Sequence, residues 1–194
     1  IRAYGDIIID DASVYALGCQ SNYSGGVFSE TGDITIESGN VWAFGGRAVN
    51  HTDSDAAGSA GISAENGDVT INGGEIIAEV ALTEHGIADG IRAYGNININ
   101  GGDITAMGAS VSIDGVVPRY SGGIFSETGD ITISGQDTVV RSDSGYARVG
   151  AAAIGTEAGD IVIKDGDVRA NGAYPAEWHS NGFIALKGDD GTGG

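Results

Sequence analysis

The chain has 194 residues, with 27 acidic side chains against 9 basic ones and a formal net charge of −18. This excess of acid disfavours nucleic acid and anionic membrane surfaces as partners, because both require clustered Lys and Arg. The sequence contains no run of about 18 apolar residues, so no membrane span is predicted. The single cysteine, Cys19, excludes an intrachain disulfide. Glycine is frequent, at 35 residues, but only two prolines occur, which excludes a collagen triple helix.

The chain is built from a repeated unit. Residues 24–39 read SGGVFSETGDITIESG, and residues 121–135 repeat nearly the same segment as SGGIFSETGDITISG. The general form is Gly-Ile-x-Ala/Ser, then Gly-Asp-Ile-Thr-Ile, then Gly-Gly-x-Val-x-Ala. Self-similarity at a period of roughly 25–35 residues predicts a stacked repeat architecture. Copies of the unit begin at Ile1, Gly26, Gly61, Gly90, Gly123, Ala153 and, incomplete, at Gly182.

Each unit contains three short alternating runs bounded by glycine, a pattern typical of β-strands. In the second copy these runs are Val27–Ser29, Asp33–Ile36 and Val41–Ala43. We therefore predict an all-β fold, a single-stranded parallel β-helix with three short strands per coil, about six to seven coils and the usual right-handed crossover. An antiparallel sandwich or barrel is the alternative, but it would not bring the same motif to the same corner in every unit.

One solenoid domain is expected to span residues 1–194, with superunits of roughly 1–89 and 90–181 and a partial last coil, 182–194. The chain starts in mid-motif without Met, so we expect a mature or trimmed piece of a longer precursor. In the fifth coil either Thr138 or Val139 could point inward. The residues predicted to face the interior are Val14, Val27, Ile34, Ile36, Val41, Ile62, Val69, Ile71, Ile76, Ile91, Ile97, Ile99, Ile104, Ile124, Ile131, Ile133, Ile154, Ile161, Ile163 and Val168, with the small partners Ala43, Ala64, Ala78, Ala93, Ala106 and Ala170.

Stacking the coils places equivalent acidic residues in columns on the surface. One column is an Asp or Asn after glycine, which either closes a turn by accepting a backbone N–H or contributes to calcium binding. A neighbouring column carries glutamates in two adjacent pairs. A retaining glycosidase pair is a weaker interpretation of these glutamates, because duplication produces the pairing twice. The candidate calcium ligands are Asp33, Asp68, Asp130, Asp160, Glu30, Glu65, Glu127 and Glu157.

Apolar and aromatic side chains gather on the outward face of the third predicted sheet. Two rows are expected there, one starting with Tyr15, Trp42 and Ile77, the other with Leu17 and Phe44; the first row continues through Thr105, Val139 and Arg169. Such a patch predicts either a contact surface or the underside of the inserts at 46–60 and 79–89. Further rings lie in the loop 172–181, where they bind a glycan or, in the case of Trp178, cap the last coil. The candidate ligand-binding residues are Tyr15, Trp42, Phe44, Tyr174, Trp178 and His179.

Residues 89–106, DGIRAYGNININGGDITA, resemble coils of bacterial secreted and surface parallel β-helix proteins of the carbohydrate-binding type. The resemblance implies a non-catalytic, calcium-carrying protein outside the cell that binds acidic plant polysaccharide such as polygalacturonate. It covers nearly the whole chain. The family's Asp-Asp/Gly-Asp-Gly motif before the first strand is matched only at Ala88-Asp89-Gly90, so its calcium sites do not carry over to the other coils.

We therefore expect a non-catalytic bacterial protein of the cell surface or exterior that binds polysaccharide, with calcium as a candidate aid. An alternative is a cell-surface stalk or fibre whose copies stack end to end, because the chain begins and ends at the same point of the coil. A second alternative is a polysaccharide lyase or hydrolase. Its basic group would be Arg92 in an outward column of the first sheet, but the neighbours there, Ser63 and Phe125, suit that chemistry poorly.

Overall fold

The computed structural model describes residues 1–48, 58–80, 86–109, 118–172 and 187–188, and the regular elements within these ranges are all β-strands in three parallel sheets. Sheet A holds β1 (Arg2–Ala3), β4 (Tyr23–Ser29), β7 (Gly58–Ala64), β10 (Ile87–Ala93), β13 (Tyr120–Ser126) and β16 (Gly150–Thr156). Sheet B holds β2 (Ile7–Ile9), β5 (Ile34–Ile36), β8 (Val69–Ile71), β11 (Ile97–Ile99), β14 (Ile131–Ile133), β17 (Ile161–Ile163) and β19 (Lys187–Gly188). Sheet C holds β3 (Ala12–Leu17), β6 (Gly39–Gly45), β9 (Glu75–Val80), β12 (Asp103–Met107), β15 (Val139–Asp143) and β18 (Asp167–Asn171).

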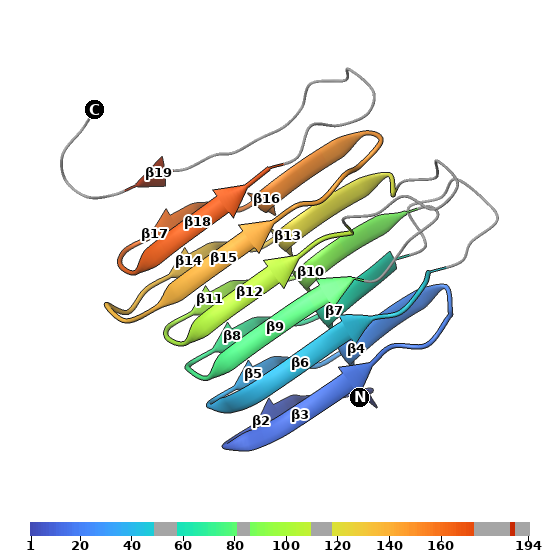
Figure 1. Cartoon of the computed structure of the whole chain (residues 1–194), viewed down its shortest axis with the longest axis horizontal. Coiled ribbons are helices and arrows are strands. Elements are labelled where there is room, and N and C mark those ends of the chain that lie inside the picture. The colour runs from blue at the N-terminus through green and yellow to red at the C-terminus, as the bar shows by residue number, and fades with distance from the viewer. Residues whose placement is uncertain (49–57, 81–85, 110–117, 173–186, 189–194) are drawn as a thin grey trace.

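Each strand pairs in parallel with the equivalent strand of the next coil. Six successive coils each contribute one strand to each sheet, and β19 adds one strand of a seventh coil beside β17. Figure 1 shows these coils stacked in chain order, from the blue first coil to the orange sixth coil. The predicted all-β parallel β-helix with three strands per coil is confirmed. No helix in the described part of the chain is long and apolar enough to span a membrane.

The core consists of columns of β-branched side chains that run through the coils. In each three-residue strand of sheet B the first and third side chains face the interior and the second faces outward. In β5, for example, Ile34 and Ile36 are completely buried and Thr35 between them is half-buried. Branched side chains suit this position because they pack well against their counterparts one strand spacing, about 4.8 Å, away. Nearly all of the predicted interior residues are buried. The exceptions, in the first and sixth coils, are only partly buried: Val14, Ile163, Val168 and Ala170.

The structure fixes the register of β15 in the fifth coil, which the sequence left open. Ile99 pairs with Ile133 but Asp103 pairs with Val139, so the turn of this coil holds two extra residues. Thr138 is buried within the turn, whereas Val139 points outward. The predicted outward row through Thr105, Val139 and Arg169 was therefore wrong. Arg141 occupies the position between Thr105 and Arg169.

The strands of sheet A are longer than the sequence pattern indicated. The predicted inserts at 46–60 and 79–89 overlap β7 and β10, which begin at Gly58 and Ile87. Each longer strand contains a small residue that pairs with no residue in the neighbouring strands, such as Gly61. A Cβ atom on Gly61 would lie 2.6 Å from the backbone nitrogen of Glu79, so glycine lets sheets A and C meet closely there.

The Asp/Asn column forms a hydrogen-bonded ladder, which we call the Asx ladder. The Oδ1 atom of each member accepts the backbone N–H of the next member, one coil further on, at 2.7–3.0 Å. The predicted turn role thus extends between coils. Asn96 takes the same place as an aspartate, because the ladder bond uses only Oδ1. The described members are Asp6, Asp33, Asp68, Asn96, Asp130 and Asp160.

We predict that Asp68→Ala lowers the free energy of unfolding by about 1–2 kcal/mol, because the Asn96 N–H loses its acceptor. Asp68→Asn keeps an oxygen at the same place and should cost less than half as much. Urea denaturation of the two variants and the wild type at pH 7 measures the difference. Equal losses in both variants would show that the negative charge, not the ladder bond, stabilises the turn.

Candidate functional site

A pocket of about 70 Å³ opens on the outer face of sheet A, over β4, β7 and β10. It exists because β7 carries small side chains where its neighbours carry large ones. Gly58 lies between Tyr23 and Ile87, and Ser63 lies between Phe28 and Arg92. We call this the sheet A groove, and its lining residues are Tyr23, Ser24, Phe28, Gly58, Ser59, Ala60, Ser63, Glu65, Ile87, Arg92 and Glu127.

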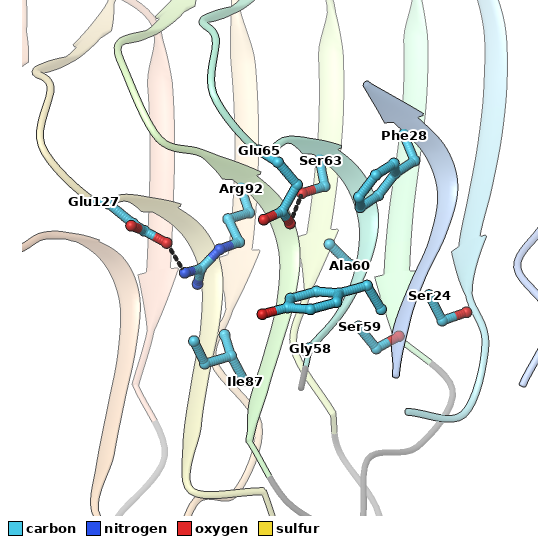
Figure 2. Close-up of a pocket in the computed structure, with 11 residues that line it drawn as sticks. Ser24, Phe28, Gly58, Ser59, Ala60, Ser63, Glu65, Ile87, Arg92 and Glu127 are labelled. Carbon is cyan, nitrogen blue, oxygen red and sulfur yellow. Dashed lines mark hydrogen bonds and ion pairs between the residues drawn. The ribbon is translucent and has the colours of Figure 1, made fainter. Parts of the chain in front are cut away.

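Figure 2 shows how the labelled side chains surround the groove. Arg92 and Ile87 lie on one side and Phe28 on the other, with Ala60 and Ser63 between them. Two carboxylates stand at the rim. The hydroxyl of Ser63 donates to Oε1 of Glu65 at 3.1 Å, and Arg92 donates to Oε1 of Glu127.

Arg92 is held between two carboxylates. Its Nη1 donates to Oδ2 of Asp89 at 2.8 Å, its Nη2 donates to Glu127, and its guanidinium lies 5.8 Å from the ring centroid of Phe125. Only 13% of the Arg92 side chain is exposed. Burial alone would lower the pKa of Arg92, but the carboxylates of Asp89 and Glu127 outweigh it and raise that pKa overall. Arg92 therefore stays a cation and is unsuited to abstract a proton.

Asp89 is an acid in a position where the neighbouring strands carry alanine and glycine. It pairs in register with Ala60 and Gly122, and its side chain is almost completely buried beneath Arg92. Burial raises the pKa of Asp89 to about 6, and Arg92 and a hydrogen bond from the Gly122 backbone limit the rise. Sequence reasoning singled out Asp89 only for its motif. Its structural role could have been recognised from the sequence because the equivalent positions of the neighbouring coils, Ala60 and Gly122, are small and uncharged.

Tyr23 forms the exposed part of the groove wall. A Cβ atom on Gly58 would lie 3.8 Å from a ring carbon of Tyr23, an ordinary contact distance, so the ring packs over β7 at Gly58. The Tyr23 residue is 40% exposed. Partial burial, followed by the nearby Glu65 carboxylate, raises the pKa of its hydroxyl. The groove thus combines an aromatic wall with an electronegative rim.

A second copy of the arginine cluster lies at the first coil. Arg2 donates to Glu30 at 2.9 Å and its guanidinium lies 4.9 Å from the ring centroid of Phe28. These residues are equivalent to Arg92, Glu127 and Phe125, as the duplicated sequence predicts. The copies differ in exposure, because 61% of the Arg2 side chain is accessible to solvent. Arg2 is therefore a natural control for Arg92.

The predicted calcium ligands do not converge. One oxygen each of Asp33, Asp68 and Asp130 accepts a bond in the Asx ladder, and Asp160 is its last described member. Glu30 and Glu127 pair with arginines, Glu65 with Ser63, and Glu157 is exposed. Among the described residues no group of three or more His, Cys, Asp or Glu side chains is placed to hold a metal ion. Calcium takes six to eight oxygens, so these side chains alone do not supply its site and calcium binding remains a prediction.

The predicted aromatic patch lies on sheet C, and we call it the aromatic strip: Tyr15, Leu17, Trp42, Phe44 and Ile77. Tyr15 and Leu17 are about two-thirds exposed, at 68% and 64%, and the other three are half-buried. The ring centroids of Tyr15 and Phe44 lie 5.6 Å apart, and the two ring planes are tilted by 54°. Phe44 pairs in register with Glu79, whose pKa is raised by burial.

Several predicted features lie outside the described residues. They include three candidate ligand-binding residues, Tyr174, Trp178 and His179. They also include the parts of the inserts, 49–57 and 81–85, on which the loop-cover alternative for the aromatic strip depends.

Comparison of this chain with protein-family models, with curated proteins and with solved structures found no significant match.

We predict that Arg92→Ala destabilises the fold by about 3 kcal/mol or more, because it leaves the buried Asp89 carboxylate unpaired. The matched change Arg2→Ala should cost less than about 1 kcal/mol, since the Arg2–Glu30 pair is largely exposed. Urea denaturation at pH 7 measures both. Similar losses for the two variants would mean that the Arg92–Asp89 pair adds nothing special to stability.

The pKa of Asp89 predicts a pH effect of definite sign. Its folded pKa, about 6, lies above the ordinary 3.8, so the folded state binds more protons between these values. The contribution of Asp89 to stability therefore falls as pH rises from about 4 to 6, by at most about 3 kcal/mol, and is level above about pH 7. Asp89→Asn removes this term. Thermal or urea unfolding of both proteins across pH 4–8 should show the wild type losing stability relative to the variant, and a constant difference would contradict the assignment.

Proposed function

We propose that this chain is a non-catalytic protein of the bacterial cell surface or exterior that binds polysaccharide along the outer faces of its β-helix. The aromatic strip carries the proposal. It places Tyr15, Trp42 and Phe44 on one face of sheet C, with Tyr15 largely open to solvent.

The geometry of the strip suits an extended sugar chain. Parallel strands set successive side chains about 4.8 Å apart along the solenoid axis, so Tyr15 and Trp42 lie side by side in one row and Phe44 lies in the neighbouring row. Aromatic rings present an apolar face to the C–H groups of a pyranose, and the polar tips of Tyr and Trp remain available for hydrogen bonds. The carboxylate of Glu79 at the end of the Phe44 row adds an acceptor for sugar hydroxyls. A polymer can use several such weak contacts together.

We also propose that the protein is not a catalyst, and the ion pairs and raised pKa of Arg92 support this. A polysaccharide lyase needs a group that accepts a proton from the sugar, and Arg92, bonded to Asp89 and Glu127 with a raised pKa, is a poor base. Calcium remains a candidate aid to binding. Because the described side chains do not converge on a metal, backbone or ligand oxygens would complete its coordination.

We predict that Trp42→Ala and Tyr15→Ala each weaken polysaccharide binding by about 3- to 10-fold, the contribution expected of a stacked ring. Pull-down with insoluble neutral and acidic polysaccharides measures it, and parallel samples with a chelator test the calcium contribution. Tyr94→Ala, which removes an exposed ring between β10 and β11, is the control and should bind normally. Binding to no polysaccharide, with or without calcium, would refute the proposed function.

A further inference from the structure

We propose that the sheet A groove is a separate binding site for the amino group of an amino-sugar residue. The proposal rests on the proposed function in so far as the amine belongs to a glycan. It uses residues of sheet A that lie apart from the aromatic strip on sheet C.

The size of the groove selects a substituent rather than a whole sugar. Its volume, about 70 Å³, corresponds to two or three water molecules and is well below that of a pocket for a complete ligand. The small residues Gly58, Ala60 and Ser63 form the floor. An ammonium group on one ring carbon fits this space while the sugar ring remains at the open mouth.

The charge of the groove selects a cation. One guanidinium, that of Arg92, pairs with the carboxylates of Asp89 and Glu127, and a third carboxylate, that of Glu65, also lines the groove. Asp89 is buried and bonded to Arg92, so it is not available to a ligand. The described contacts use one oxygen each of Glu65 and Glu127, which leaves the second oxygen of both for a donor. An ammonium group supplies such donors together with the missing positive charge.

The same arrangement disfavours acidic glycans. A uronate would have to compete for Arg92, whose positive charge is already paired with the carboxylates of Asp89 and Glu127. It would also meet the excess negative charge of the rim. A neutral sugar can donate hydroxyl hydrogens to Glu65 and Glu127 but leaves their charge uncompensated. The partly exposed ring of Tyr23 at the mouth offers a stacking face for the pyranose, which a simple alkylamine would not use.

The test is an NMR titration of the isotope-labelled full chain with a β-1,4-linked glucosamine oligomer. Glucose and galacturonate oligomers of the same length, and a lysine oligomer, are titrated in parallel. We expect the glucosamine oligomer to shift the amide signals of Ser63 and Glu65 and to bind about three- to fivefold more tightly than the glucose oligomer. The double variant Glu65→Gln/Glu127→Gln should lose this preference. Asp137→Asn/Asp165→Asn, which removes the same charge from exposed turns outside the groove, should keep it.

A second variant protects the test against misfolding or a general charge effect. Ser63→Phe leaves the charge unchanged and fills the groove with the side chain that Phe28 carries at the paired position of β4, so it should abolish the amino-sugar preference. Equal affinity for glucose and glucosamine oligomers, or equal effects of the two double variants, would overturn the proposal. Equally tight binding of the lysine oligomer in the groove would overturn the assignment to a glycan.

The two proposals can fail separately. Trp42→Ala should weaken the binding of neutral polysaccharide and leave the glucosamine-induced shifts at Ser63 intact. If no neutral or acidic polysaccharide binds but the groove still prefers the glucosamine oligomer, the role of the aromatic strip is refuted and the groove assignment stands.

Discussion

The fold depends on one constraint, the in-register pairing of each strand with its equivalent one coil away. Parallel pairing fixes the spacing at about 4.8 Å and sets each side chain beside its counterpart. Buried positions therefore become continuous columns, such as Ile34, Val69 and Ile97. Polar positions become ladders by the same rule, as in the Asx ladder. Surface features arise wherever one coil departs from its neighbours, and the sheet A groove is such a departure.

The sequence repeat predicted the interior residues well, because equivalent positions of successive coils must all carry an apolar side chain that fits the core. The Ile-Thr-Ile strands of sheet B were located correctly, since both isoleucines must be buried and the two turns beside them are short. The fifth coil was harder. Gly135 adopts a left-handed conformation, with φ +96°, and the two additional residues beyond it can be absorbed in more than one way. In the structure Thr138 is buried in the turn, and Val140 takes the core position paired with Ile104.

The candidate site was much less predictable than the core. Glu65 and Glu127 were singled out from the sequence as members of one glutamate column, and Arg92 as a member of another column. The groove that joins them depends on residues that are small, and an absent side chain gives no chemical signal. Gly58 and Asp89 also lie before the repeated Gly-Ile motif, in segments that the pattern indicated as loops, whereas the structure places them in β7 and β10. Asp89 stands where the neighbouring coils carry glycine or alanine, and the structure explains this acid by its ion pair with Arg92.

The Asx ladder gives the solenoid a direction along which it can assemble. In every rung described, the side chain of the earlier coil accepts and the backbone of the later coil donates. A coil that has already formed thus presents an acceptor to the segment that follows it in the chain. Repeat proteins fold by propagation between neighbours, and a chain emerging from the ribosome offers its N-terminal coils first. The ladder is suited to templated, vectorial folding, in which each turn guides the next as it is synthesised.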